Sequence, residues 1–170
     1  MTKLTREKVK EIIKGRRLMY EQCIIGHECY ETTNLLRMDL SGLDLSGLDL
    51  SGFNFRWCNM KEVNLYRAVL VFTYAIEADL TGANLTEAKI LYSDFTDAKL
   101  IGANLTDAFL MGTNLTNADL TEADLRGANL TDANLTEADL TSADLTSANL
   151  TGANLTNAIL KGTILEDKSN

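Results

Sequence analysis

The sequence predicts an all-β solenoid, a coil made of five-residue repeats, preceded by a short α-helical cap. Two observations carry this prediction. A large apolar residue occupies nearly every fifth position from Leu35 to Leu165, and Leu holds 22 of these 27 positions. Five residue types (Leu, Thr, Ala, Asn and Asp) supply 91 of the 170 residues. We therefore divide the chain into an N-terminal cap at 1–32, the repeats at 33–167 and a tail at 168–170.

Each position of the repeat has its own residue type. The residue two before the apolar centre is Ala in 16 of the 27 repeats, and the residue just before the centre is Asp or Asn in 20. A period of five fits neither the turn of a helix nor the two-residue alternation of a strand. We therefore expect each repeat to form one side and one corner of a coil, with the centre and the small residue pointing inward. We expect Asp or Asn at the corner, where its side chain bonds the backbone two residues on, and Thr or Ser on the extended side.

These repeats resemble the pentapeptide repeat family, whose motif is a small residue, Asp or Asn, Leu or Phe, Ser or Thr, and any residue. The run Ala148-Asn149-Leu150-Thr151-Gly152 matches this motif at every position. The resemblance covers about four-fifths of the chain and implies a right-handed quadrilateral β-helix with four repeats per coil. The 27 repeats would then form nearly seven coils, in a rod roughly 30 Å long at the usual strand spacing.

The N-terminal segment has the pattern of an amphipathic helix. Val9, Ile12 and Ile13 recur at helical spacing, and Thr5 precedes them as an N-cap residue. Gly15 weakens a helix, so we expect the helix to end early there.

The first coil carries large residues at the small position of the repeat, where later coils carry Ala. We expect these residues to lean towards the N-terminal end and to contact the cap, because the open end of a solenoid exposes apolar surface and unpaired backbone groups. They are Met38, Leu43, Leu48 and Phe53.

The other end of the repeats has no comparable cover, since five residues follow Leu165. An exposed apolar coil end is a template for another chain. We therefore predict a homodimer formed through the C-terminal coil ends, with Leu155, Leu160, Ile164 and Leu165 as the contact residues.

Apolar side chains also gather at outward positions of one face, where the other repeats carry polar residues. Because residues twenty apart stack in the implied fold, we expect them to form one contiguous surface, which we call the apolar patch. Two interpretations remain open: the patch binds a partner protein, or residues 1–32 fold over it. The patch consists of Val69, Val71, Phe72, Tyr74, Leu91, Tyr92, Phe109 and Met111.

Charge is distributed unevenly along the chain. Residues 1–37 hold eight Lys or Arg and five Asp or Glu, a net +3, whereas residues 38–170 hold eight and nineteen, a net -11. A negative surface without clustered cations argues against direct nucleic-acid binding. We expect the carboxylates to stack in acidic ladders on solvated faces that keep the rod soluble. The ladders are Asp79, Asp119 and Asp139 on one face, and Asp124 and Asp144 on the next.

No set of residues indicates an enzyme. The chain has one histidine, His27, so a nucleophile and base pair has a single candidate base. Cys23, His27, Cys29 and Cys58 would add up to four zinc ligands, but their spacing is not a standard zinc pattern, and cysteine is commonly a small buried residue. We therefore expect no catalytic residue, no metal, no cofactor and no small-molecule substrate.

The cellular setting follows from what the sequence lacks. No apolar run approaches the ~18 residues of a membrane span, and the N-terminus has no apolar leader. We expect a cytoplasmic protein with no membrane partner.

The sequence therefore favours a non-enzymatic rigid scaffold for protein–protein interaction, presenting acidic faces and one apolar face to a partner that it does not identify. The family resemblance implies an alternative. Some pentapeptide repeat proteins are DNA mimics that bind type II topoisomerases such as gyrase and protect against quinolones. Such mimics often carry loops that project from the coil, whereas the five-residue register here is unbroken.

Overall fold

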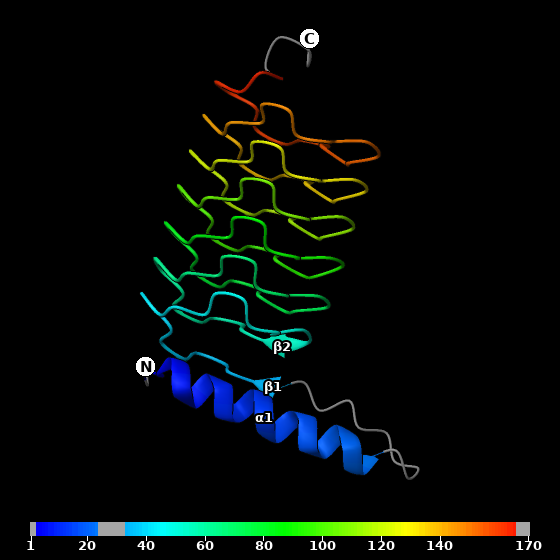
Figure 1. Cartoon of the computed structure of the whole chain (residues 1–170). Helices are drawn as coiled ribbons and strands as arrows, with labels where there is room; N and C mark the ends of the chain where they lie inside the picture. Colours follow the sequence, from blue (N-terminus) through cyan, green and yellow to red (C-terminus); the bar gives the residue numbers. More distant parts are fainter. Residues whose placement is uncertain (1–2, 24–32, 166–170) are drawn as a thin grey trace.

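A computed structural model describes residues 3–23 and 33–165 and shows a stack of similar coils with one helix at its N-terminal end (Figure 1). The helix is α1 (Arg6–Cys23). Two short strands, β1 (Thr33–Asn34) and β2 (Phe53–Asn54), form a parallel pair in which Thr33 lies opposite Phe53. The paired residues are twenty apart in the chain, so β1 and β2 lie in successive coils and one full coil of the chain leads from β1 to β2.

The same twenty-residue spacing continues through the stack. Single parallel bridges join Asp39 to Asn59 at one end and Asp139 to Ile159 at the other. Between coils, the Leu40 N–H donates to the Asn59 carbonyl at 2.7 Å and the Asn59 N–H donates to the Met38 carbonyl at 3.0 Å. Four five-residue repeats therefore make each coil, and every coil bonds to the next through its backbone.

Each corner of a coil is a tight turn. The Ala103 N–H donates to the Leu100 carbonyl at 3.0 Å, and Gly102 between them has a φ of +59°. Glu77 holds the same corner position without being glycine, with a φ of +54°. A left-handed backbone costs a non-glycine residue about 1–2 kcal/mol. The hydrogen bond from the Glu77 N–H to the Thr96 carbonyl of the next coil, at 3.0 Å, helps to offset that cost.

Two outward positions are exchanged relative to the sequence prediction. Asp139 lies in a bridge on the side of the coil, whereas Thr141, two residues later, lies in the corner turn. The predicted hydrogen bond is nevertheless present, because the Thr141 N–H donates to the Asp139 Oδ1 at 2.9 Å. The acceptor must precede the turn by two residues to reach that N–H, so Asp or Asn occupies the side and Thr or Ser the corner.

The predicted inward positions are buried. Leu85 and Leu105 at repeat centres, and Ala83 and Ala103 two residues before them, are at most 1% exposed. Identical side chains therefore stack on one another through the middle of the rod.

One inward column does not repeat a single residue type, and its large and small side chains compensate for one another in volume. Ala75 takes the place of Leu, and the residues directly below and above it are Phe55 and Phe95. All three side chains are at most 2% exposed. Two large rings flanking one small residue keep the column's volume close to that of three leucines, which packed interiors require.

A neighbouring inward column carries hydroxyl groups. Thr73, Ser93 and Thr113 are buried, and each hydroxyl donates to a backbone carbonyl of the preceding coil. The acceptors are the carbonyls of Leu50, Leu70 and Ile90. These buried polar atoms are therefore satisfied without water.

The segment before the first coil bonds to its open backbone edge. The Leu4 N–H donates to the Asp39 carbonyl at 3.0 Å, and Lys3 forms a parallel bridge with Asp39. The Arg6 guanidinium donates to the carbonyls of Asp44 and Ser46 and lies 3.2 Å from the Asp44 carboxylate. Inside the stack, the equivalent carbonyls accept backbone N–H groups from the coil below.

Helix α1 begins as predicted and runs further than predicted. Thr5 is its N-cap, because the Lys8 N–H donates to the Thr5 Oγ1 at 3.2 Å. Val9 is fully buried in the cluster that contains the repeat core, and Ile12 and Ile13 pack against that cluster. The prediction that Gly15 ends the helix is wrong, since α1 continues to Cys23. A glycine costs a helix only about 1 kcal/mol, which neighbouring turns can outweigh.

Candidate functional site

The apolar patch lies at one corner of the rod and on the two sides that meet there. Val69, Lys89 and Phe109 succeed one another on one side, and Tyr74 lies on the other. Four rings are exposed: Phe72 by 62%, Tyr92 by 52%, Phe109 by 44% and Tyr74 by 37%. The remaining members are half-buried; these are Val69, Val71, Leu91 and Met111.

Stacked rings form the edge of this corner. The Phe72 and Tyr92 rings are stacked, with centroids 5.8 Å apart and planes at 21°. The Cδ1–Cε1 edge of the Tyr92 ring in turn lies against Gly112, where a Cβ atom would be 2.5 Å from the nearest ring carbon. Glycine at position 112 therefore provides the space that the Tyr92 ring occupies.

Two arginines extend the aromatic surface beyond the residues that the sequence singled out. The Arg56 guanidinium lies 5.3 Å from the centre of the Tyr74 ring, and that of Arg37 lies 5.1 Å from the centre of the Trp57 ring. Trp57 is 38% exposed. The sequence did not indicate Arg37, Arg56 and Trp57, because they lie at the next corner of the coil and none is a multiple of twenty residues from a patch residue. Trp, Tyr and Arg are the residue types that dominate binding energy at protein interfaces.

The five carboxylates of the acidic ladders all have a structural task. In each case Oδ1 accepts the backbone N–H two residues on, at 2.9–3.2 Å. Lys99 stands between Asp79 and Asp119, and Lys61 lies 3.3 Å from the Asp79 carboxylate, so this ladder is not continuously negative. The five residues are Asp79, Asp119, Asp124, Asp139 and Asp144.

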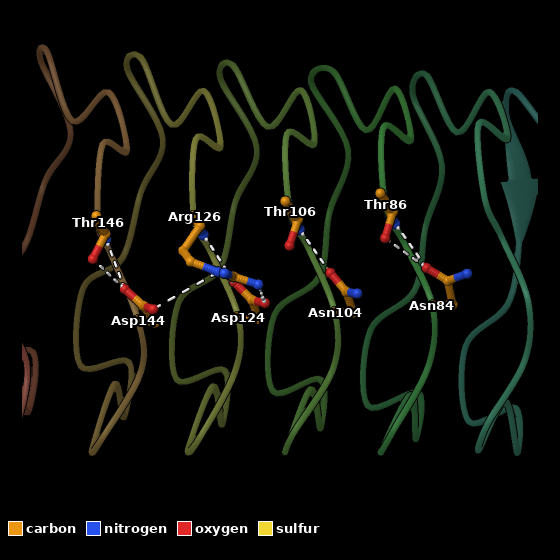
Figure 2. A network of polar contacts seen from close by, with 8 residues as sticks. All are labelled: Asn84, Thr86, Asn104, Thr106, Asp124, Arg126, Asp144 and Thr146. Atoms are coloured by element: carbon orange, nitrogen blue, oxygen red, sulfur yellow. Dashed lines mark hydrogen bonds and ion pairs between the residues drawn. The ribbon is translucent and has the colours of Figure 1, made fainter.

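Asparagine performs the same task and adds a bond that aspartate cannot make. The Thr136 N–H donates to the Asn134 Oδ1 at 3.1 Å, and the Asn134 Nδ2 donates to the Thr116 hydroxyl one coil below at 2.9 Å. Asp124 has no such donor, so the hydroxyl of Thr106 below it receives no comparable bond (Figure 2). The negative charge in the ladders is therefore not required by the corner.

Arg126 replaces threonine in the column of Figure 2 and holds two carboxylates together. Its Nε and Nη2 donate to the two oxygens of Asp124 at 2.8 and 2.6 Å, and its Nε lies 3.8 Å from the Asp144 carboxylate. The hydrogen bond from Arg126 lowers the pKa of Asp124 below its ordinary value. The pKa of Asp144 is lowered chiefly by the Thr146 hydroxyl, while the charge of Asp124 opposes that shift.

Of the cysteine and histidine residues weighed as zinc ligands, Cys58 has a described side chain. His27 and Cys29 lie outside the described residues, and so does the side chain of Cys23. Cys58 is buried, its thiol donates to the Leu35 carbonyl at 2.7 Å, and burial raises its pKa to about 11. Within residues 3–23 and 33–165 there is no cluster of metal-binding side chains.

The residues assigned to the two ends of the rod lie at those ends. Met38, Leu43 and Leu48 are half-buried against the core, while Phe53 is fully buried and stacks on Phe55 with centroids 5.6 Å apart. At the C-terminal end, Leu155, Leu160 and Leu165 are half-buried and Ile164 is 57% exposed. In the described part of the chain, no helix has the length and apolar character to cross a membrane.

Comparison with known proteins gives one family. The model of the family "Pentapeptide repeats" matches four overlapping stretches, 39–71, 64–100, 93–132 and 128–167. Together they include more than two thirds of the chain. No curated protein matches the sequence.

Several solved structures are similar to this chain. The pentapeptide repeat protein Rfr23 from the cyanobacterium Cyanothece 51142 is 28% identical over 74% of this chain and 90% of its own, with a TM-score of 0.49. HetL, a pentapeptide repeat protein involved in heterocyst differentiation regulation in the cyanobacterium Nostoc sp. PCC 7120, is 27% identical over 86% and 94%, with a TM-score of 0.28. The plasmid-mediated fluoroquinolone resistance protein QnrB1 is 17% identical over 95% and 88%, with a TM-score of 0.33.

Replacing Gly112 by Ala should displace the Tyr92 ring from its position over the corner. We expect the free energy of unfolding to fall by about 0.5–1.5 kcal/mol more than in the control Gly102→Ala, because a stacked ring pair is lost. Gly102 has a similar φ, of +59°, and open space around its missing Cβ, so both variants bear the same backbone strain. Urea denaturation measures the difference. If the Gly112→Ala variant is still less stable than the Gly102→Ala variant when Tyr92 is also replaced by Ala, the Tyr92 ring is not the cause of the difference.

Replacing Arg126 by Thr should leave the Asp124 and Asp144 carboxylates facing each other one coil apart. Arg126 lowers the pKa of Asp124 in the folded state. The ion pair therefore adds to the free energy of unfolding at pH values above the ordinary carboxyl pKa, and this stabilisation is lost as the pH falls through the lowered pKa. We expect a lower melting temperature at neutral pH and low salt, and no difference in strong acid. Adding Asp124→Asn recreates the neutral pair seen at Asn104 and Thr106 and should restore the melting temperature. Equal melting temperatures at neutral pH would contradict the assignment.

Proposed function

Because this chain belongs to the pentapeptide repeat family, we propose that it is a non-enzymatic rigid scaffold that binds another protein through the apolar patch. The fold of the family is a right-handed quadrilateral β-helix, and its members are generally structural or interaction modules. The proposal assigns to this chain a binding surface that is built on the fixed backbone of the coils.

The observation that carries the proposal is the exposure of four aromatic rings at one place on a polar rod. Phe72, Tyr74, Tyr92 and Phe109 are each more than one third exposed. Monomeric proteins rarely expose contiguous apolar surface without using it. Leu4 and Arg6 bond to the carbonyls of Asp39, Asp44 and Ser46 at the end of the rod, so these contacts of the N-terminal segment lie at the first coil and not at the rings.

The mechanism that we propose is binding by a preformed surface. The rings project from corners whose backbone is bonded to the coils on both sides, as at Phe72, where the N–H donates to the Leu91 carbonyl at 3.1 Å. A partner that binds such a surface loses little affinity to ordering it.

The ends of the rod complete the proposal. We assign residues 1–32 as the cap of a rod of nearly seven coils, supported by the bonds of Leu4 and Arg6 to the first coil. Pairing of two chains through the C-terminal coil stays a prediction, and the exposure of Ile159 (50%) and Ile164 (57%) supports it.

A second candidate function is DNA mimicry at a type II topoisomerase. The columns of Asp119 with Asp139 and of Asp124 with Asp144 favour it, since parallel bridges stack these carboxylates at regular spacing. Lys99 lies within the first column and Arg126 lies beside the second, and both reduce the negative charge.

The variant Phe72→Ser with Tyr92→Ser tests the scaffold proposal. Because both rings are more than half exposed, we expect the free energy of unfolding to fall by no more than the about 0.5–1.5 kcal/mol of the lost ring stacking. We also expect loss of the partner that the unaltered protein captures from a lysate of its own cells. The control is Asp107→Ser with Glu122→Ser, two exposed corner residues with the same left-handed backbone outside the patch. The control should retain the partner. A large loss of stability in the first variant would instead indicate that part of this chain covers the patch.

A gyrase supercoiling assay tests the second candidate. If the acidic columns replace DNA, added protein should inhibit supercoiling or relieve quinolone inhibition, and Asp124→Asn with Asp144→Asn should weaken the effect. Asparagine keeps the acceptor for the corner N–H, so this variant changes charge without changing the coil. Absence of any effect at micromolar protein would remove the DNA mimic and leave the scaffold proposal intact.

A further inference from the structure

One corner of the rod separates its charges along its length. At the N-terminal end it carries Arg37 and Arg56, and further along it carries Glu77, Asp97 and Glu137. Backbone hydrogen bonds hold these repeats one above the other. At the N-terminal end the Arg37 N–H donates to the Arg56 carbonyl, and further along the Glu137 N–H donates to the Thr156 carbonyl. No other Lys or Arg occupies this corner up to residue 157. We call these five residues the segregated corner.

The charges of the segregated corner have no ionic partner among the residues that the structure describes. Among the described residues, no carboxylate forms an ion pair with Arg37 or Arg56, although the protein has an excess of acids. Each arginine lies over an aromatic ring instead, which leaves its N–H groups available. Over the same described residues, Glu77, Asp97 and Glu137 form no ion pair either.

The segregated corner adjoins the apolar patch. The side of the coil just before it carries Tyr74, whose ring lies 5.3 Å from the Arg56 guanidinium, and the corner before that side carries Phe72 and Tyr92. Exposed rings therefore lie beside the boundary between the basic and the acidic part. An apolar centre flanked by separated charges is the arrangement expected of a protein interface.

We propose that this face binds a second copy of the chain, with the two rods side by side and antiparallel. A two-fold axis perpendicular to the rods places each segregated corner against its counterpart in the reverse direction. The arginines of one copy then lie against the acidic stretch of the other, twice per dimer, and the aromatic rings lie near the axis. A parallel arrangement would instead oppose like charges, so the charge order selects the antiparallel one.

This dimer identifies one partner of the apolar patch and so rests on the proposed function, but it involves a different surface from the C-terminal coil end. The face is narrow, and interfaces of small area are weak or transient. We therefore expect association in the micromolar range that weakens as salt rises, because the screening length falls from about 10 Å at 0.1 M to about 3 Å at 1 M.

Charge reversal followed by mixing tests the proposal. One variant, Arg37→Glu with Arg56→Glu, reverses the basic part, and the other, Glu77→Lys with Asp97→Lys, reverses the part of the acidic stretch that faces it across the axis. Both variants should fold, because charged residues already occupy the left-handed position of this corner at Arg37, Glu77 and Asp97, and Arg56 lies at the partly exposed turn position just before it. In sedimentation velocity, we expect the unaltered protein to dimerise with rising concentration. We expect the dimerisation affinity of each variant to be at least about tenfold lower.

The equimolar mixture of the two variants is the decisive measurement. In a mixed dimer, one contact pairs Glu with Lys and the other pairs Arg with the native acids, so dimerisation should return. The control Asp107→Lys with Glu122→Lys changes the net charge by the same amount as the variant that replaces two acids by lysine, but on other corners. It should dimerise like the unaltered protein. A variant of the coil end, Leu160→Glu with Ile164→Glu, should retain the side-by-side association, because it leaves the segregated corner unchanged.

Three outcomes would overturn the proposal: a monomer at every concentration, a mixture that stays monomeric, or a dimer that only the Leu160 and Ile164 variant disrupts. The last would assign dimerisation to the coil end. If the protein is monomeric but still loses its captured partner when Phe72 and Tyr92 are replaced, the scaffold function stands and the patch binds a different protein.

Discussion

The stacking of each coil on the next through backbone hydrogen bonds is the constraint on which the rest of this molecule depends. Its bridges join residues twenty apart, from Asp39 with Asn59 to Asp139 with Ile159. Every side chain therefore has neighbours whose chain positions are known in advance. The leucine and alanine columns, the carboxylate ladders and the apolar patch all follow from this single spacing.

Because neighbours lie one coil apart, a departure from the repeat is compensated one coil away. Ala75 is matched by Phe55 below it and Phe95 above it in the core. On the surface, Gly112 leaves the space that Tyr92 fills, and Arg126 neutralises the carboxylates of its own coil and of the next. A substitution in such a rod is therefore judged against the residues twenty before and twenty after it.

The coil also defines what an end must supply. The first coil presents carbonyl groups that a preceding coil would have bonded, and Leu4 and Arg6 supply donors to them. A guanidinium can satisfy two carbonyls at once, as Arg6 does at Asp44 and Ser46, because its donors form a rigid fork. A helix can thus complete a β-structure whose geometry it does not share.

The sequence by itself determined the period, the inward columns, the membership of the apolar patch and the start of the helix at Thr5. Burial selects residue type strongly, so the repeating Leu and Ala reveal which positions face inward. Only the tertiary structure decided which outward position forms the corner, since Asp, Asn and Thr are polar at both places and the backbone dihedral angles distinguish them. It also decided that α1 continues through Gly15, where a propensity of about 1 kcal/mol is too small to end a helix. The arginines over Trp57 and Tyr74 became visible only in three dimensions, because their side chains cross from one coil to the next.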